Sequence, residues 1–244
     1  MKQNYVLDIH THTLASGHAF GTIREMAQAA SERHLELLGV SEHGPGIPGT
    51  VEPIYFSTLR CVPRCLYGVT ILHGCEINVL NGGTLSLDQK YIDFLDYAII
   101  GIHEQCYQNE GEEKNTDHVI SCMKQEKVHF LAHPDDDHTP LDYKRLVPAA
   151  KKYHVALEVN NNTFRRKQRR KNCLENYKEM LSLCMEYRAP VLVSSDAHDP
   201  SQDGDISLAA EFLDQIGFDE TLILNTDAEK FLNFISFACA CGNV

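Results

Sequence analysis

The segment Asp8-Ile9-His10-Thr11-His12 ends the first apolar run of the chain, which begins at Tyr5. A short apolar run of this kind is typical of a buried strand. Alternate residues of a strand face the same side, so Asp8, His10 and His12 are expected to point together. The segment therefore predicts a first strand with three ionisable side chains gathered on one face at its end.

Six more short apolar runs follow this segment along the chain. With the first, they cover residues 5–9, 35–40, 69–72, 97–102, 128–132, 155–159 and 189–193. Helical patterns lie between them, at 22–34, 115–126, 141–153, 173–187 and 207–216, while 53–67 is ambiguous because it holds two prolines. Seven strand-then-helix units in 244 residues average about 35 residues each, the size of a βα repeat. This alternation predicts a parallel sheet, either doubly wound or closed as a barrel.

Histidines and acids follow these runs at their C-terminal ends. Their position distinguishes a closed barrel from a doubly wound open sheet. Examples are Glu42-His43, Glu76, His103, His133 and the pair Asp196-x-His198. In a barrel, all strand ends of one polarity surround one mouth, where catalytic groups collect. In an open sheet, the outer strands would lie too far apart to share a site. We therefore predict an α/β fold, a distorted seven-stranded (β/α)7 barrel resembling a TIM barrel, forming one domain over residues 1–244.

Composition limits the functions that this domain can have. The 22 basic and 34 acidic residues give a net charge of −12, which argues against a nucleic-acid coat or a protein of anionic membrane surfaces. The chain has thirteen histidines and no tryptophan. Because histidine binds metals and transfers protons near neutral pH, this surplus suggests a functional site that contains several of them. No apolar segment is long enough to span a membrane, and the first residues do not resemble a signal peptide, so we expect a cytoplasmic protein with reduced cysteines. A C-terminal helix at about 227–238 is expected to dock on the domain or contact another subunit.

These motifs, taken in order, resemble the signature of the PHP (polymerase and histidinol phosphatase) metallohydrolases, and most resemble the YcdX-type phosphatases of that family. The resemblance runs from residue 5 to about 235. It implies a distorted seven-stranded barrel that holds three divalent metal ions, usually zinc, and hydrolyses phosphoesters. The metal ligands that it implies are His10, His12, His18, His43, Glu76, His103, His133, Asp196 and His198.

The resemblance also divides these ligands among the three ions. One ion would be held by His10, His12, Glu76 and Asp196, a second by His18, His43 and His198, and a third by His103 and His133 with Glu76 as a bridge. A donor set rich in imidazole suits zinc, and manganese or iron also fits. Asp8 is a candidate for orienting a ligand histidine through its ring N–H.

The implied activity is hydrolysis of a phosphomonoester by a metal-bound hydroxide, with Asp196 and His198 as the catalytic ligands and a small phosphorylated molecule as substrate. The general acid is unassigned among Glu42, Glu104 and Asp135. The alternatives are a phosphodiesterase or exonuclease, a histidinol-phosphatase-like enzyme, an amidohydrolase and a metal-storage module. YcdX-type relatives also imply a homotrimer.

Two charged segments bear on the substrate. The run from Arg165 to Lys171 carries six positive charges in seven residues and follows the sixth strand. We therefore expect it on the mouth side, where it would steer phosphorylated ligands. The acids Asp135-Asp136-Asp137 follow His133-Pro134 and are expected to oppose a highly charged substrate.

Overall fold

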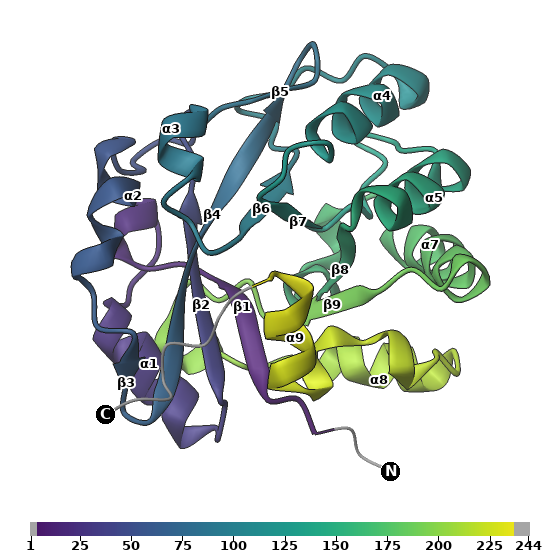
Figure 1. The fold of residues 1–244 in the computed structure, drawn as a ribbon. Coiled ribbons are helices and arrows are strands. Elements are labelled where there is room, and N and C mark those ends of the chain that lie inside the picture. Colours follow the sequence, from purple (N-terminus) through teal and green to yellow (C-terminus); the bar gives the residue numbers. More distant parts are fainter. Residues whose placement is uncertain (1–3, 237–244) are drawn as a thin grey trace.

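Seven parallel strands form the frame of the protein in a computed structural model that describes residues 4–236. Their order in the sheet is β1-β2-β4-β6-β7-β8-β9. The last strand returns to the first through a parallel bridge between Thr11 and Ala197, so the barrel is nearly closed. Figure 1 shows the helices arranged around these strands.

The seven predicted strands are all present. Their bounds are β1 Leu7–Thr11, β2 Leu37–His43, β4 Val69–Leu80, β6 Ala98–Gly101, β7 Val128–Leu131, β8 Ala156–Asn160 and β9 Val191–Ser194. The third strand is much longer than predicted, because its inward residues Gly74, Glu76 and Asn78 are buried although they are not apolar. Two short antiparallel strands that the sequence did not indicate, β3 (Cys65–Leu66) and β5 (Thr84–Leu85), pair with β4.

The helices follow the predicted alternation. They are α1 Ile23–Glu32, α2 Ile54–Thr58, α3 Gln89–Ile92, α4 Glu112–Cys122, α5 Tyr143–Tyr153, α6 Asn161–Arg165, α7 Cys173–Tyr187, α8 Ser207–Gln215 and α9 Ala228–Phe234. Helix α1 starts with the predicted capping box, in which Thr22 and Glu25 satisfy each other's backbone N–H groups. The ambiguous segment 53–67 holds only the five-residue α2 before a 3-10 turn and β3.

Two apolar layers hold the barrel together. The outer layer packs the sheet against the helices through residues such as Ile77, Leu146 and Tyr177. Inside the sheet, Tyr97 is fully buried and donates a hydrogen bond from its hydroxyl to the carbonyl of Ile9, 2.5 Å away. A Cβ at Gly74 would lie 2.5 Å from the Tyr97 ring, so this strand position requires glycine. The interior of the barrel below the mouth is therefore filled by closely packed side chains.

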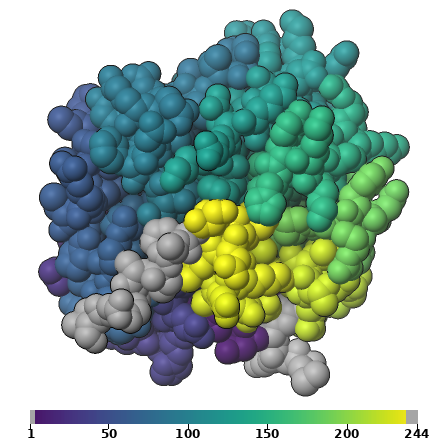
Figure 2. All heavy atoms as spheres, viewed as in Figure 1, coloured from purple at the N-terminus to yellow at the C-terminus, as the bar shows by residue number. Residues whose placement is uncertain are grey.

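Helix α9 closes the end of the barrel opposite the mouth. Phe231 stacks on the inner side chain Phe130 with ring centroids 5.7 Å apart. The carbonyl of Phe234 accepts a hydrogen bond from His154, which precedes β8. Figure 2 shows this helix, in yellow, at the centre of the visible face. These contacts pack α9 against the barrel. The predicted end of this helix at 237–238 lies outside the described residues.

No helix within residues 4–236 is both long and apolar enough to cross a membrane.

Candidate metal centre

Glu76 lies at the middle of the barrel mouth, with imidazoles around both of its carboxylate oxygens. Its Oε2 is 2.8 Å from His43 Nδ1 and 3.5 Å from His10 Nε2. Its Oε1 is 3.0 Å from His133 Nε2 and 3.2 Å from His103 Nε2. The carboxylate is fully buried within β4 rather than after it. Glu76 therefore stands between two groups of histidines, as a bridging ligand would.

Asp196 faces the two histidines of the first strand. Its Oδ1 is 3.3 Å from His12 Nε2 and 3.7 Å from His10 Nε2. Its Oδ2 accepts hydrogen bonds from the side-chain amides of Asn160 and Asn162. The first predicted group, His10, His12, Glu76 and Asp196, is thus brought together.

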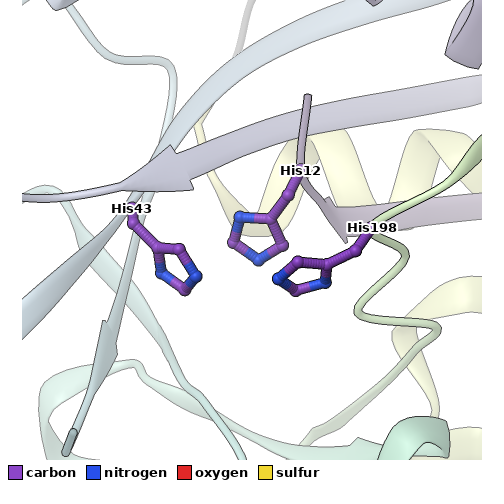
Figure 3. Close-up of side chains that lie close together, drawn as sticks. All are labelled: His12, His43 and His198. Atoms are coloured by element: carbon purple, nitrogen blue, oxygen red, sulfur yellow. The ribbon is translucent and has the colours of Figure 1, made fainter. Parts of the chain in front are cut away.

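The second predicted group lies on the outer side of the mouth. His18 Nε2 is 3.2 Å from His198 Nε2, and the ring of His18 stacks on that of His43 with centroids 4.9 Å apart. His12 also joins this group, because donor atoms of His12, His43 and His198 lie within 4.8 Å of one another. Figure 3 shows these three rings converging from separate segments of the chain. All nine predicted ligands therefore meet at one mouth.

In several of the histidine rings, the Nδ1 atom forms a hydrogen bond to a neighbouring polar group. The Nε2 atom of the same ring is then left to face the cluster. His10 Nδ1 lies 2.6 Å from Glu158, and His103 Nδ1 lies 2.6 Å from the amide oxygen of Asn78. His198 Nδ1 is 3.0 Å from the carbonyl of Asp196. The buried Nε2 atoms of His10 and His12 have no hydrogen-bond partner among the described residues. Metal-binding histidines show this arrangement, with one nitrogen on the metal and the other held by a polar group.

Burial and charge push the pKa values of these groups apart. Burial alone would lower the pKa of His10, but the carboxylates of Glu158, Glu76 and Asp196 raise it well above its usual range. Burial and the nearby His43 hold the pKa of His12 well below that range. Although burial alone would raise the pKa values of the Glu76 and Asp196 carboxyls, the surrounding histidines hold both well below their usual range. These directions favour ionised carboxylates and a neutral His12, whereas the carboxylates favour a proton on His10 that a metal ion would have to displace.

Two of the predicted ligands sit in strained backbone conformations. His133 has a φ of 29° and Asp196 a φ of 53°, in the left-handed region that side chains other than glycine rarely adopt. Such strain persists only where surrounding structure imposes it, and it concentrates at functional sites. In these backbone conformations, both side chains point into the mouth.

Glu158 is the main site residue without an assigned role in the sequence analysis. Besides the ring of His10, its carboxylate accepts hydrogen bonds from the backbone N–H of His133 and the hydroxyl of Ser194. It is fully buried in the middle of β8. The available signal was its position two residues before Asn160, the alternation that marks one face of a strand.

Asp8 does not orient a histidine ring, contrary to expectation. Its carboxylate accepts hydrogen bonds from the backbone N–H groups of Gly204 at 2.9 Å and Ser195 at 3.3 Å. It therefore ties β1 to the segment that follows β9, across the seam of the barrel. Glu42 does reach a ring, since Ser16 links it by hydrogen bonds to His12 Nδ1.

A cavity of about 580 Å³ opens above the cluster. Its walls include Glu76, His103 and His133 at the base, and Arg166 and Arg169 from the basic run. The run therefore lies on the mouth side, as predicted. The volume is in the range of small-molecule sites.

The fold and the site together define a class: βα-barrel proteins whose mouth gathers imidazoles and carboxylates able to hold a cluster of metal ions. The chain belongs to the PHP domain family, whose model matches residues 8–235.

Proteins named probable phosphatases are similar to it along nearly their whole length. One from Clostridium novyi is 38% identical over 232 residues, covering 95% of this chain and 94% of its own. Another, from Caldanaerobacter subterraneus, is 36% identical over 239 residues, covering 96% and 92%. These relatives and the family support a phosphatase-type hydrolase.

Solved structures agree on the fold. The histidinol phosphate phosphatase of Lactococcus lactis, solved with zinc, L-histidinol and phosphate, superposes with a TM-score of 0.56 at 16% identity, over 89% of this chain and 95% of its own. A chain of an archaeal ribonuclease P complex superposes with a TM-score of 0.59 at 15% identity, over 94% and 90%.

Proposed function

We propose that the protein is a phosphomonoesterase that acts on a small phosphorylated molecule with three divalent metal ions, zinc by preference. The arrangement around Glu76 carries this proposal: one buried carboxylate has imidazoles on both sides. Among the described residues, the buried ring nitrogens of His10, His12 and His43 that face it have no hydrogen-bond partner. The zinc in the histidinol phosphate phosphatase structure supports the choice of metal.

The proposal keeps the predicted division of the nine ligands among three ions. His10, His12 and Asp196 would hold one ion with Glu76, and His103 and His133 would hold another with the opposite oxygen of Glu76. His18, His43 and His198 would hold the third. Neutral imidazoles joined by carboxylates are typical zinc donors.

The residues around the proposed ligands would position them for phosphoester hydrolysis. Bound divalent ions would supply a nucleophile from water at neutral pH and neutralise the phosphoryl oxygens. Glu158 would position the ring of His10 and the backbone of His133 through hydrogen bonds. Asn160 and Asn162 would fix the orientation of the Asp196 carboxylate in the same way. Asp196 and His198 would act as ligands beside the reacting phosphate.

Chelation tests the proposed activity directly. Purified protein is expected to contain close to three zinc ions per chain and to hydrolyse p-nitrophenyl phosphate. Treatment with a chelator should abolish turnover, and zinc or manganese should restore it. Undiminished phosphatase activity in metal-free protein would overturn the proposal. Faster hydrolysis of a phosphodiester or an amide than of any monoester would replace it by one of the alternatives.

Acidification should remove the metal ions. Protons compete with metal for neutral imidazole, and His10 and His133, whose pKa values are raised despite burial, should compete first as the pH falls. We expect bound zinc per chain, measured after equilibrium dialysis, to fall between about pH 7 and pH 5. Full zinc retention at the acid end would contradict the assignment of these imidazoles as ligands.

Replacing Glu158 by Gln should weaken zinc binding by about 10- to 100-fold, because a neutral amide no longer raises the basicity of His10. Competition with a zinc-binding dye measures the affinity. Glu104→Gln removes the same charge from an exposed residue of the cavity wall and is the matched control. Equal affinities in the two variants would show that Glu158 has only a structural role.

A further inference from the structure

Helix α6 leads from the candidate metal centre to the outer wall of the cavity. Near its start, the side-chain amide of Asn162 donates a hydrogen bond to Asp196 Oδ2. Arg166 follows one turn later, and its backbone N–H donates to the carbonyl of Asn162. Four residues of helix advance by about 6 Å. Arg166 directly follows the last residue of α6 and Arg169 ends the 3-10 turn after it, and both line the cavity above the cluster.

These two arginines differ from the others of the basic run. Arg165 pairs with Asp205, and Arg170 pairs with the buried Asp135 at 3.2 Å. Arg166 and Arg169 are exposed, line the cavity and form no ion pair with any described carboxylate. Acidic residues outnumber basic ones by 34 to 22, so unpaired guanidinium groups facing a cavity call for an explanation.

The three acids expected to repel a charged substrate are largely engaged elsewhere. Asp135 is held by Arg170, and Asp137 accepts a hydrogen bond from Asn176 at 2.7 Å. Asp136 does line the cavity, but it accepts hydrogen bonds from the ring of His138 and the backbone N–H of Lys171. Of the three acids, only Asp136 lines the cavity. On the cavity wall, Glu104, beside His103, remains as an acid without a described partner.

We propose that the substrate carries a second phosphate group, separate from the one hydrolysed, and that Arg166 and Arg169 bind it. This inference rests on the proposed phosphatase function and narrows its substrate class to bisphosphorylated small molecules. Arginine suits the task because its planar guanidinium donates paired hydrogen bonds to phosphate oxygens. Glu104 disfavours the opposite orientation, in which the second phosphate would lie near His103.

The test compares fructose 6-phosphate with fructose 1,6-bisphosphate. The wild-type protein should favour the bisphosphate in kcat/KM by about 10-fold or more, since each charge-assisted contact is worth about that factor. The variant R166S/R169S should lose this preference and keep its kcat/KM for the monophosphate within about threefold. The variant K167S/K171S removes the same charge from the same run at residues that do not line this cavity, and it should retain the preference. Equal losses in the two variants would leave only general electrostatic steering, and a wild type without preference would overturn the subsite.

A binding measurement distinguishes a failure of the second-phosphate site from a failure of the proposed phosphatase activity. Calorimetry on chelator-treated protein should show that fructose 1,6-bisphosphate binds more tightly to the wild type than to R166S/R169S by about 10-fold, with K167S/K171S like the wild type. Hydrolysis of the monophosphate without any such difference refutes the second-phosphate site and leaves the phosphatase standing. The difference in binding without hydrolysis of any phosphate ester refutes the phosphatase and retains an anion site.

Discussion

Replacing Asp196 by Asn is expected to lower kcat for phosphate ester hydrolysis by about three orders of magnitude, or roughly 4 kcal/mol of transition-state stabilisation. The carboxylate faces the ring nitrogens of His10 and His12 on one side and the amides of Asn160 and Asn162 on the other. An asparagine amide presents its NH2 group to one of these sides, where it replaces an acceptor with a donor. It also removes a negative charge that a divalent ion would need nearby.

The substitution should leave the fold intact. Asparagine adopts the left-handed conformation of residue 196 more readily than most residues, so the φ of 53° remains accessible. Asp214→Asn, on the exposed side of α8, removes the same charge far from the mouth and should match the wild type. The measurements are kcat under saturating substrate and thermal unfolding. A kcat within about threefold of the wild type in Asp196→Asn would show that this carboxylate is no part of the reacting centre.

Local patterns along the sequence were sufficient to predict the strands and the gathering of the candidate ligands at one mouth. Continuous apolar runs marked the buried strands, and the position of His43, His103 and His133 after three of them implied a common mouth. The predicted start of α1 was accurate because Thr22 and Glu25 form a cap within four residues. Features that depend on neighbours in sequence are the ones that a single sequence reveals best.

Features that depend on distant contacts could not be predicted. Asp8 and His10 stand two residues apart, yet Asp8 contacts Gly204 and His10 contacts Glu158. The pairing of Arg170 with Asp135, which neutralises an acid expected to repel substrate, joins segments 35 residues apart. The extension of β4 was missed for a related reason: its inward glycine and polar residues are buried only because Tyr97 and the histidines surround them.

Glu76→Gln should empty more than one metal site, whereas His18→Ala should deplete one. Glu76 contributes one oxygen to His10 and His43 and the other to His103 and His133, so its charge is shared by both sides of the cluster. Burial disfavours the charged form of this carboxylate, yet its pKa is held well below the usual range by the same histidines. His18 is exposed, and its ring contacts only His43 and His198 among the predicted ligands.

Metal analysis by mass spectrometry after dialysis against a weak chelator distinguishes the two variants. We expect Glu76→Gln to retain about one zinc ion or fewer per chain and to lose activity entirely, because a buried amide offers no charge to balance two neighbouring cations. His18→Ala should retain about two ions and some activity, since the two sites joined by Glu76 keep all their predicted ligands. Glu42→Gln changes a buried carboxylate that reaches the cluster only through Ser16 and is the matched control for charge loss near the mouth. It should keep close to the wild-type metal content. Equal metal loss in Glu76→Gln and His18→Ala would mean that Glu76 does not bridge two ions, and the division of the nine ligands into three sites would then be wrong.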